Sequence, residues 1–194
     1  MFCGIDVGGT HTDAVLADEN GIVVTSKIVT DRNNLVGTIR ESLDRILGQV
    51  NPGVVEWINI STTLSTNAIV EDKTEKVGVL VSSGPGVNPS GYEIGDNFRI
   101  IRGSIDHRGT VVQDLDAKDM KGALKEFSKK ELRVFSVISK FSTRNPSHEG
   151  RLAELVQETG DYVTQGHRLS GELNFPRRIT TAYYNSAVWR LYNQ

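Results

Sequence analysis

The sequence lacks several features that define common classes of protein. Its one cysteine, Cys3, excludes an internal disulfide and any metal site built from several cysteines. The 22 Lys and Arg residues are balanced by 24 Asp and Glu, and the formal charge of −2 argues against nucleic-acid binding through bulk charge. No run approaches the roughly 18 apolar residues of a membrane span, and the N-terminus does not resemble a signal peptide. We therefore expect a soluble, cytoplasmic protein that binds neither nucleic acid nor membrane.

Familiar catalytic motifs are missing as well. There is no GxxxxGK[ST] run and no GxGxxG run, so any phosphate site is neither a P-loop nor a dinucleotide fold of the usual kind. The four histidines form no HxxxH pair, which argues against a zinc site. Ser90-Gly91 is no nucleophile elbow, because Asn88 stands where that motif needs glycine. Cys3 lies in an apolar run and is expected to be a small core residue.

The hydrophobic fraction of 38% predicts a globular chain with a buried core. Apolar runs near residues 2–5, 14–17 and 22–29 predict three strands joined by tight hairpins. Leucine and isoleucine at helical spacing from Leu35 to Leu47, followed by Gly48, predict a helix that Asn33 or Asn34 caps. A strand near 57–60, a short helix over 64–70 and a buried strand over 77–81 extend the order to βββαβαβ.

The second half of the sequence predicts further αβ units. A helix after Asp116 precedes a buried strand at 134–138, and Asn145-Pro146 begins another helix that ends at Gly160. A short strand near 162–164 follows. The glycine and proline content predicts an irregular excursion at about 82–110. We assign residues 1–175 to one domain and 176–194 to a C-terminal helix, which either closes the domain or connects to a second lobe.

The most informative stretch is GIDVGGTHTD, residues 4–13. A strand that ends near Asp6 is followed by Gly8 and Gly9, whose backbone N–H groups can approach anionic oxygens closely. Thr10 and Thr12 add hydroxyl donors. Mg²⁺ favours carboxylate and phosphate oxygens, so Asp6 is the candidate metal ligand. The alternative is an ordinary glycine hairpin with a solvated aspartate.

A second polar stretch, STTLSTN, covers residues 61–67. It lies at a predicted junction between a strand and a helix, where free N–H groups favour an anion or a polarised carbonyl. The candidates for binding are Thr62, Thr63, Thr66 and Asn67. A helix cap needs only one such side chain, although a cap with spare hydroxyls is the alternative explanation.

Five segments, in this order, resemble the family of hydantoinase A, 5-oxoprolinase and the acetone carboxylase β subunit. They are GIDVGGTHTD at 4–13, STTLSTNAIVE at 61–71, KVGVLVSSG at 76–84, KFSTRNPSHE at 140–149 and RRITTAYYNSAV at 177–188. The likeness is to the family's N-terminal region only. His11 departs from the phenylalanine common at its position, and residues 85–90 depart from the family pattern.

The resemblance implies an α/β fold: a ribonuclease-H-like lobe of the actin-like ATPase fold, βββαβαβα, with an additional αβ unit. It implies ATP and Mg²⁺ as cofactors. Asp6 would organise the metal, and the phosphates would be surrounded by Gly8, Gly9, Thr10 and Thr12. The transferring phosphoryl group or the substrate carbonyl would lie near Thr62, Thr63, Thr66 and Asn67. The catalytic set implied is Asp6, Thr10, Thr63 and Asn67.

The implied reaction is ATP-dependent opening of a cyclic amide of the hydantoin or 5-oxoproline type, in which phosphorylation turns the amide oxygen into a leaving group. A second lobe or subunit would complete the site, and a homo-oligomer is a further possibility. The first alternative is a subunit of an ATP-dependent ketone carboxylase. The second is a non-catalytic module that binds a partner through exposed aromatic residues, Tyr183, Tyr184, Trp189 and Tyr192. A sugar or acetate kinase of the same fold is the weakest alternative.

Overall fold

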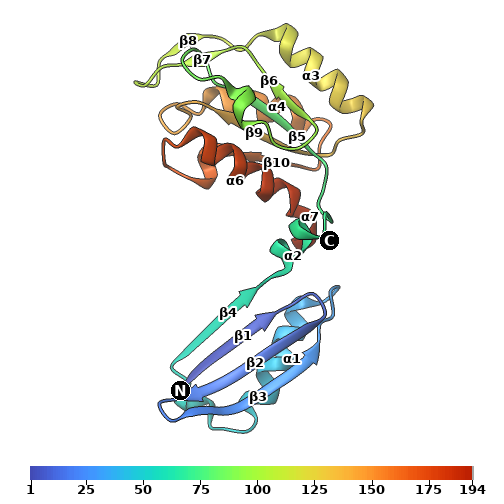
Figure 1. The fold of residues 1–194 in the computed structure, drawn as a ribbon, viewed down its shortest axis with the longest axis vertical. Coiled ribbons are helices and arrows are strands. Elements are labelled where there is room, and N and C mark those ends of the chain that lie inside the picture. Colours follow the sequence, from blue (N-terminus) through green and yellow to red (C-terminus); the bar gives the residue numbers. More distant parts are fainter. Residues whose placement is uncertain (194) are drawn as a thin grey trace. The chain divides into compact units, whose positions relative to one another are not determined.

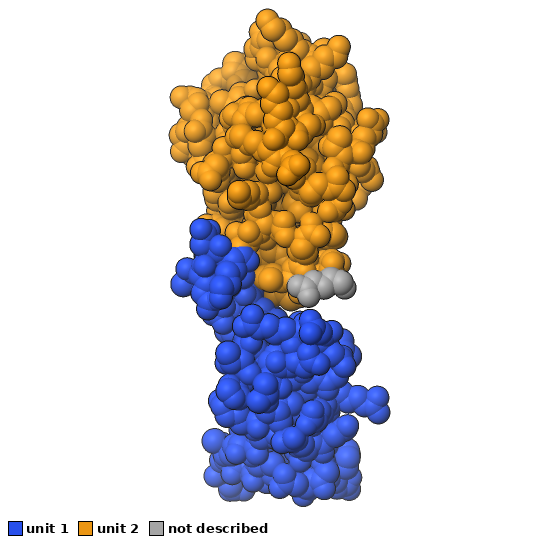
Figure 2. Space-filling model, turned by 90° about the vertical axis from the view of Figure 1, so that its right-hand side faces the viewer, with its two compact units in different colours: residues 1–73, 194 blue, residues 74–193 orange. Residues whose placement is uncertain are grey.

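The computed structural model describes residues 1–193, which form two compact units, Met1–Lys73 and Thr74–Asn193 (Figure 2). We describe each unit by itself. Sequence analysis assigned residues 1–175 to one domain, whereas this division falls between Lys73 and Thr74. Within residues 1–193, no helix is both long enough and apolar enough to cross a bilayer.

Unit 1 contains one mixed sheet with helices and a short 3₁₀ turn (Figure 1). Its elements are β1 (Phe2–Val7), β2 (His11–Asp18), β3 (Gly21–Val29), α1 (Leu35–Leu47), η1 (Pro52–Val54), β4 (Trp57–Thr62) and α2 (Leu64–Val70). The strand order is β3-β2-β1-β4, with antiparallel hairpins from β1 to β3 and a parallel pair between β1 and β4. The predicted hairpins and both predicted helices are confirmed.

The alternation of side chains in β1 and β2 decides which face of this sheet is buried. Cys3, Ile5 and Leu16 point to the α1 side and pack against Ile46. Cys3 is 1% exposed, and burial raises the pKa of its thiol, as expected of a core residue. The side chain of Asn34 caps α1 by accepting from the Gly37 amide.

Unit 2 is a parallel α/β structure with a separate hairpin (Figure 1). Its elements are β5 (Val77–Ser82), η2 (Pro89–Tyr92), β6 (Phe98–Ile100), β7 (Ser104–Ile105), β8 (Val111–Gln113), α3 (Ala117–Lys129), β9 (Val134–Ser139), α4 (Ser147–Gln157), β10 (Tyr162–Gln165), α5 (Gly166–Leu169), α6 (Phe175–Ala187) and α7 (Trp189–Tyr192). The main sheet has the order β10-β9-β5-β6 and is parallel throughout.

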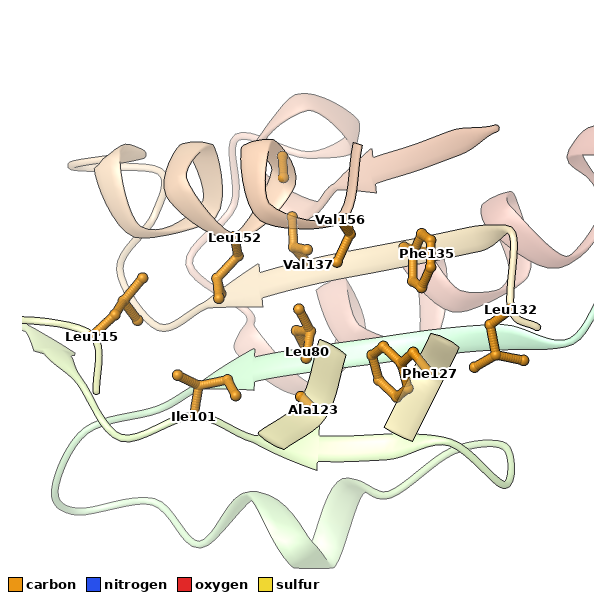
Figure 3. Packing of buried hydrophobic residues seen from close by; sticks show 11 residues of the cluster. Leu80, Ile101, Leu115, Ala123, Phe127, Leu132, Phe135, Val137, Leu152 and Val156 are labelled. Atoms are coloured by element: carbon orange, nitrogen blue, oxygen red, sulfur yellow. The ribbon is translucent and has the colours of Figure 1, made fainter. Parts of the chain in front are cut away.

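The core of unit 2 lies on both faces of β5 and β9, every residue of which is buried. On one face, Leu80 and Val137 pack against Phe127 of α3 and Leu152 of α4 (Figure 3). On the other face, Val79 packs in a cluster with residues of α6. Strands buried on both faces are typical of parallel sheets with helices on either side.

Two sequence predictions need correction. The order βββαβαβ is right, but β5 pairs with β6 and β9 and not with β4, so the strands divide between two sheets. The excursion at about 82–110 is not wholly irregular, since it contains β6, whose short run Phe98–Ile100 pairs with β5. Strands of two or three residues give too little alternation for detection in a sequence.

The C-terminal helix expected at 176–194 is divided into α6 and α7, and α6 begins at Phe175, where Asn174 caps it and Pro176 stands in its first turn. It packs into the core of unit 2 through Ile179 and Ala182. Gln194 lies outside the described residues. The predicted aromatic surface is only partly exposed, because Trp189 stacks on Tyr162 with 4.9 Å between ring centroids.

Candidate functional site

The glycine loop after β1 is a tight turn held by backbone hydrogen bonds. The Gly8 amide donates to the His11 carbonyl at 3.0 Å, and a Cβ at position 8 would lie only 2.8 Å from that oxygen. Glycine is therefore required at position 8. The guanidinium of Arg32 donates from Nε to the Gly9 carbonyl oxygen at 2.8 Å. Thr10 is exposed at the tip of the loop, where its Oγ1 lies 3.3 Å from Nδ1 of His11.

Parallel pairing of β1 with β4 brings the two polar motifs together. Their carboxyl ends lie side by side, with Asp6 opposite Ser61 and Val7 opposite Thr62. The Ser61 hydroxyl donates to Oδ1 of Asp6 at 2.8 Å, and the Thr62 hydroxyl donates to the Val7 carbonyl at 3.0 Å. The glycine loop and the 61–67 stretch therefore meet at one edge of the sheet.

Helix α2 starts at this same edge. Thr62 Oγ1 accepts from the Leu64 amide at 3.3 Å, whereas Thr63, the N-cap residue, makes no side-chain cap hydrogen bond. Asn67 Nδ2 lies 3.4 Å from Oγ1 of Thr63. The side chains of Thr63, Thr66 and Asn67 are exposed. These exposed polar groups exceed what a cap requires.

Thr12 is placed differently from the other candidates. Its side chain is fully buried on the α1 side of the sheet, where Oγ1 is 2.9 Å from Oγ1 of Thr30. This hydroxyl stabilises the glycine loop through its contact with Thr30. The structure thus brings Asp6, Gly8, Gly9, Thr10, Thr62 and Thr63 to one edge, while the side chain of Thr12 lies in the core.

Sequence analysis missed two charged residues that the structure adds to this region. Asp13 lies directly opposite Asp6 in the β1–β2 pair, and Oδ1 of Asp13 is 2.9 Å from Nζ of Lys27. The other is Arg32. Asp13 stands within the GIDVGGTHTD motif and could have been found from its alternation with Asp6. Nothing in the sequence around Arg32 indicates a contact with the glycine loop.

The pair of carboxylates at Asp6 and Asp13 has electrostatic consequences. Like charges directly opposite in a sheet repel each other, and Lys27 offsets part of this repulsion by contacting both carboxylate oxygens of Asp13. Both aspartates line a hollow of about 760 Å³ on the face of the sheet away from α1, together with Lys27, Asn59 and Ser61. Among residues 1–193, no cluster of three or more His, Cys, Asp or Glu could hold a metal by itself. The two aspartates suit an ion that also takes oxygen ligands from phosphate or water.

The motifs KFSTRNPSHE and RRITTAYYNSAV meet in unit 2, around the buried carboxylate of Glu149. Its Oε1 accepts from the Ser139 amide at 2.8 Å, and its Oε2 accepts from the His167 amide at 2.8 Å. Arg178, 1% exposed, places Nη1 at 3.5 Å from Oε1 and donates to Ser142 and to the Ser139 carbonyl. These two motifs thus hold the carboxyl end of β9 in place.

His148, next to this cluster, should make the free energy of unfolding depend on pH. Its imidazole is 1% exposed, and neither ring nitrogen has a partner within the described chain. Burial lowers the pKa of this ring, and the positive charge of Arg151 lowers it further against the opposing effect of Asp114. In the unfolded chain the His148 imidazole takes up a proton near pH 6.5. In the folded chain the same imidazole stays neutral until the pH is lower.

We expect the free energy of unfolding to fall as the pH drops from 7.5 through 6.5, with His148 contributing a slope of up to about 1.4 kcal/mol per pH unit. His148→Leu should flatten this slope, as measured by urea denaturation at several pH values. The exposed His107 provides the matched control, His107→Leu, which should keep the slope. An unchanged slope in His148→Leu would contradict the assignment.

Comparison with known proteins identifies relatives. Residues 2–160 match the model described as the hydantoinase/oxoprolinase N-terminal region. The α subunit of caprolactamase from Pseudomonas jessenii is 26% identical over 94% of this chain, which covers 30% of that subunit. The γ subunit of acetophenone carboxylase from Aromatoleum aromaticum is 24% identical over 96% of this chain and 31% of that subunit.

Solved structures match as well. An ATP-dependent caprolactamase from Pseudomonas jessenii aligns over 100% of this chain and 32% of its own, with a TM-score of 0.68 and 25% identity. A nucleotide-free acetone carboxylase aligns over 98% of this chain and 32% of its own, with a TM-score of 0.74 and 19% identity. The chain thus spans about a third of the length of these relatives.

Proposed function

This chain belongs to the hydantoinase/oxoprolinase N-terminal region family, and we propose that it is the phosphate-binding part of an ATP-dependent enzyme that opens cyclic amides of the hydantoin or 5-oxoproline type. The observation that carries this proposal is the hydrogen bond from Ser61 to Asp6, which joins the glycine loop to the Ser/Thr-rich junction at one sheet edge. The similarity to an ATP-dependent caprolactamase supports the same class of substrate.

The donor set at this edge fits a magnesium–nucleotide complex. Asp6 and Asp13 supply carboxylate oxygens of the kind that Mg²⁺ takes together with phosphate and water. The missing side chains let the loop turn tightly, since a Cβ would meet the His11 carbonyl oxygen at Gly8 and the Arg32 guanidinium, 3.1 Å away, at Gly9. Arg32 adds a guanidinium beside the turn, and guanidinium groups bind phosphate well. When bound, ATP would supply the phosphoryl group that converts an amide oxygen into a leaving group.

The residues of this chain have distinct proposed roles in that reaction. Asp6 would hold the metal when it is bound, and Ser61 fixes the carboxylate by donating to Oδ1. Thr10 donates to phosphate from the loop, and Thr12 holds the loop in shape through Thr30. Thr63, Thr66 and Asn67 are exposed and orient the substrate carbonyl or the transferring group. Phosphoryl transfer depends mainly on such positioning and charge neutralisation.

We propose that unit 1 is the first part of a ribonuclease-H-like lobe, which further sequence must complete. Every residue of β4 is exposed, including Trp57 and Ile60, so this strand presents an unpaired edge within the described residues. An apolar edge strand favours pairing with another strand. The relatives are about three times as long as this chain, and the matched α and γ chains are named as subunits. A second lobe or a partner subunit is the proposed completion.

A ketone carboxylase subunit is the second candidate, favoured by the similarity to acetophenone carboxylase. Both candidates need phosphorylation of a carbonyl oxygen, so the site alone does not separate them. We expect the protein, assembled with its completing lobe or subunit, to release phosphate in step with ring opening of hydantoin, 5-oxoproline or caprolactam. Phosphate release stimulated by acetone or acetophenone with bicarbonate, and by none of the cyclic amides, would instead establish the carboxylase function.

A further inference from the structure

At the carboxyl ends of β5 and β9 in unit 2, the chain segments that follow the two strands pass to opposite faces of the sheet. The two strands are adjacent and parallel (Figure 3), and Ser82 pairs with Ser139 at their ends. After β5 the chain follows the α6 face, where Val87 packs. After β9 it follows the opposite face, where Leu152 of α4 packs. In open parallel sheets, divergence of this kind opens a crevice that commonly binds a ligand.

The structure contains hollows at this place. One of about 200 Å³ is lined by Ser83, Pro85, Ser104, Ile105, Lys140 and Phe141, among others. A neighbouring one of about 1070 Å³ shares Ser83, Pro85 and Ser104 with it and extends along residues 83–89. The exposed lining is largely apolar, as in many sites for small organic molecules.

The loops that form this crevice adopt costly backbone conformations. Phe141 has φ of 62°, a left-handed conformation that is unfavourable for a bulky side chain. Its carbonyl accepts from the Arg144 amide at 2.8 Å, which holds the strained turn in place. Gly84 and Gly86 are also left-handed, at φ of 63° and 83°. Their amide nitrogens donate to no other group within residues 1–193.

Lys140 is the ammonium group of the smaller hollow, whose lining also includes Asp106 and His107, and Arg102 lines the larger one. Nζ of Lys140 lies 3.2 Å from the Pro85 carbonyl oxygen and 5.1 Å from the centre of the Phe141 ring. Across the described chain, no carboxylate lies within ion-pair distance of this ammonium. By contrast, Arg102 nearby pairs with Asp116 and Asp119. The Asp106 carboxylate accepts from two amides of its own turn, those of Arg108 and Thr110. A cation at the wall of an apolar hollow attracts an anionic group that carries an apolar body.

We propose that this crevice is a binding site for a small organic carboxylate, separate from the nucleotide site in unit 1. The carboxylate pairs with Lys140 and accepts from the free amides of Gly84 and Gly86. The apolar body of the ligand occupies the hollow lined by Pro85, Ile105 and Phe141. The site depends on unit 2 alone, and its existence does not require the proposed enzyme activity.

Calorimetric titration of the whole chain with benzoate tests this site. We expect saturable binding of benzoate at least about tenfold tighter than that of acetate, which lacks the apolar body, or benzamide, which lacks the charge. Lys140→Met keeps an unbranched side chain of similar bulk without the charge and should weaken benzoate binding by about tenfold or more. Lys121→Met, at an exposed position of α3, is the matched control and should bind as the parent does.

Two further measurements locate the site. Benzoate should shift the amide NMR signals of Ser83, Gly84, Gly86 and Phe141, and Asp6→Asn in unit 1 should leave the affinity unchanged. Unaltered circular dichroism in Lys140→Met separates lost binding from lost folding. Equal affinity for benzamide, undiminished binding by Lys140→Met, shifts confined to other residues, or no saturation at about 10 mM benzoate would each overturn the proposal.

Discussion

Replacing Asp6 with Ala should lower the ATP-dependent turnover of the completed protein by at least about 100-fold, the usual cost of removing a key electrostatic contact in an active site. Asp6 is the proposed metal ligand at the end of β1, and Ser61 fixes its carboxylate through a 2.8 Å hydrogen bond. Without this carboxylate the nucleotide loses its positioned counter-ion. Calorimetric titration of Mg·ATP into this chain should likewise show binding that is lost in Asp6→Ala.

Two variants separate the charge of Asp6 from its other contributions. Asp6→Asn keeps an oxygen acceptor for Ser61 but removes the negative charge, so we expect a loss close to that of Asp6→Ala. Asp44→Ala removes a carboxylate that is 74% exposed on α1 and should leave both turnover and binding unchanged. Full activity in Asp6→Ala would rule out the role given to this carboxylate. Normal activity in Asp6→Asn alone would restrict that role to its hydrogen bond with Ser61.

The elements of unit 1 were predictable from the sequence because their signals are local. Alternation in β1 and β2 gives period 2, and the apolar stripe of α1 follows period 3.6 with a cap at Asn34. That the two motifs belong to one site was expected only from the family resemblance, and the contact between Asp6 and Ser61 was not predicted. It depends on the parallel pairing of β1 with β4, which joins residues far apart in the chain.

The parts that were mispredicted depend on tertiary contacts. Strand β5 is apolar on both faces, so its sequence shows that it is central but not which strands flank it. The contact between Arg32 and the Gly9 carbonyl follows from the path of the chain after β3, for which the sequence offers no pattern. The burial of Thr12 could have been anticipated, because Ala14 and Leu16 occupy the same face of β2.

The second large effect is expected at Glu149 in unit 2. Its carboxylate is fully buried, and its contacts include the amides of Ser139 and His167 and the guanidinium of Arg178. Burial lowers the pKa of the Arg178 guanidinium, and the negative charge of Glu149 opposes this shift. Glu149→Gln removes that charge and leaves a buried arginine without its counter-ion. We expect a loss of about 3–5 kcal/mol in the free energy of unfolding.

Urea denaturation followed by tryptophan fluorescence can measure this loss within unit 2. The chain has two tryptophans, and Trp57→Phe leaves only Trp189, whose ring stacks on Tyr162. Glu154→Gln is the matched control, because this glutamate is exposed on the same helix α4. The control should change the midpoint little, whereas Glu149→Gln should lower it strongly or prevent unit 2 from folding.

The double variant Glu149→Gln/Arg178→Met keeps the prediction testable if the single variant does not fold. Met fills part of the space of Arg178 without a charge, so the double variant no longer buries an unpaired ion. Breaking a buried ion pair costs more than removing both partners, and the two effects should therefore be strongly non-additive. We expect the double variant to be more stable than Glu149→Gln alone. Additive losses would instead mean that the two side chains stabilise unit 2 through independent hydrogen bonds, with Arg178 acting through Ser142 and the Ser139 carbonyl.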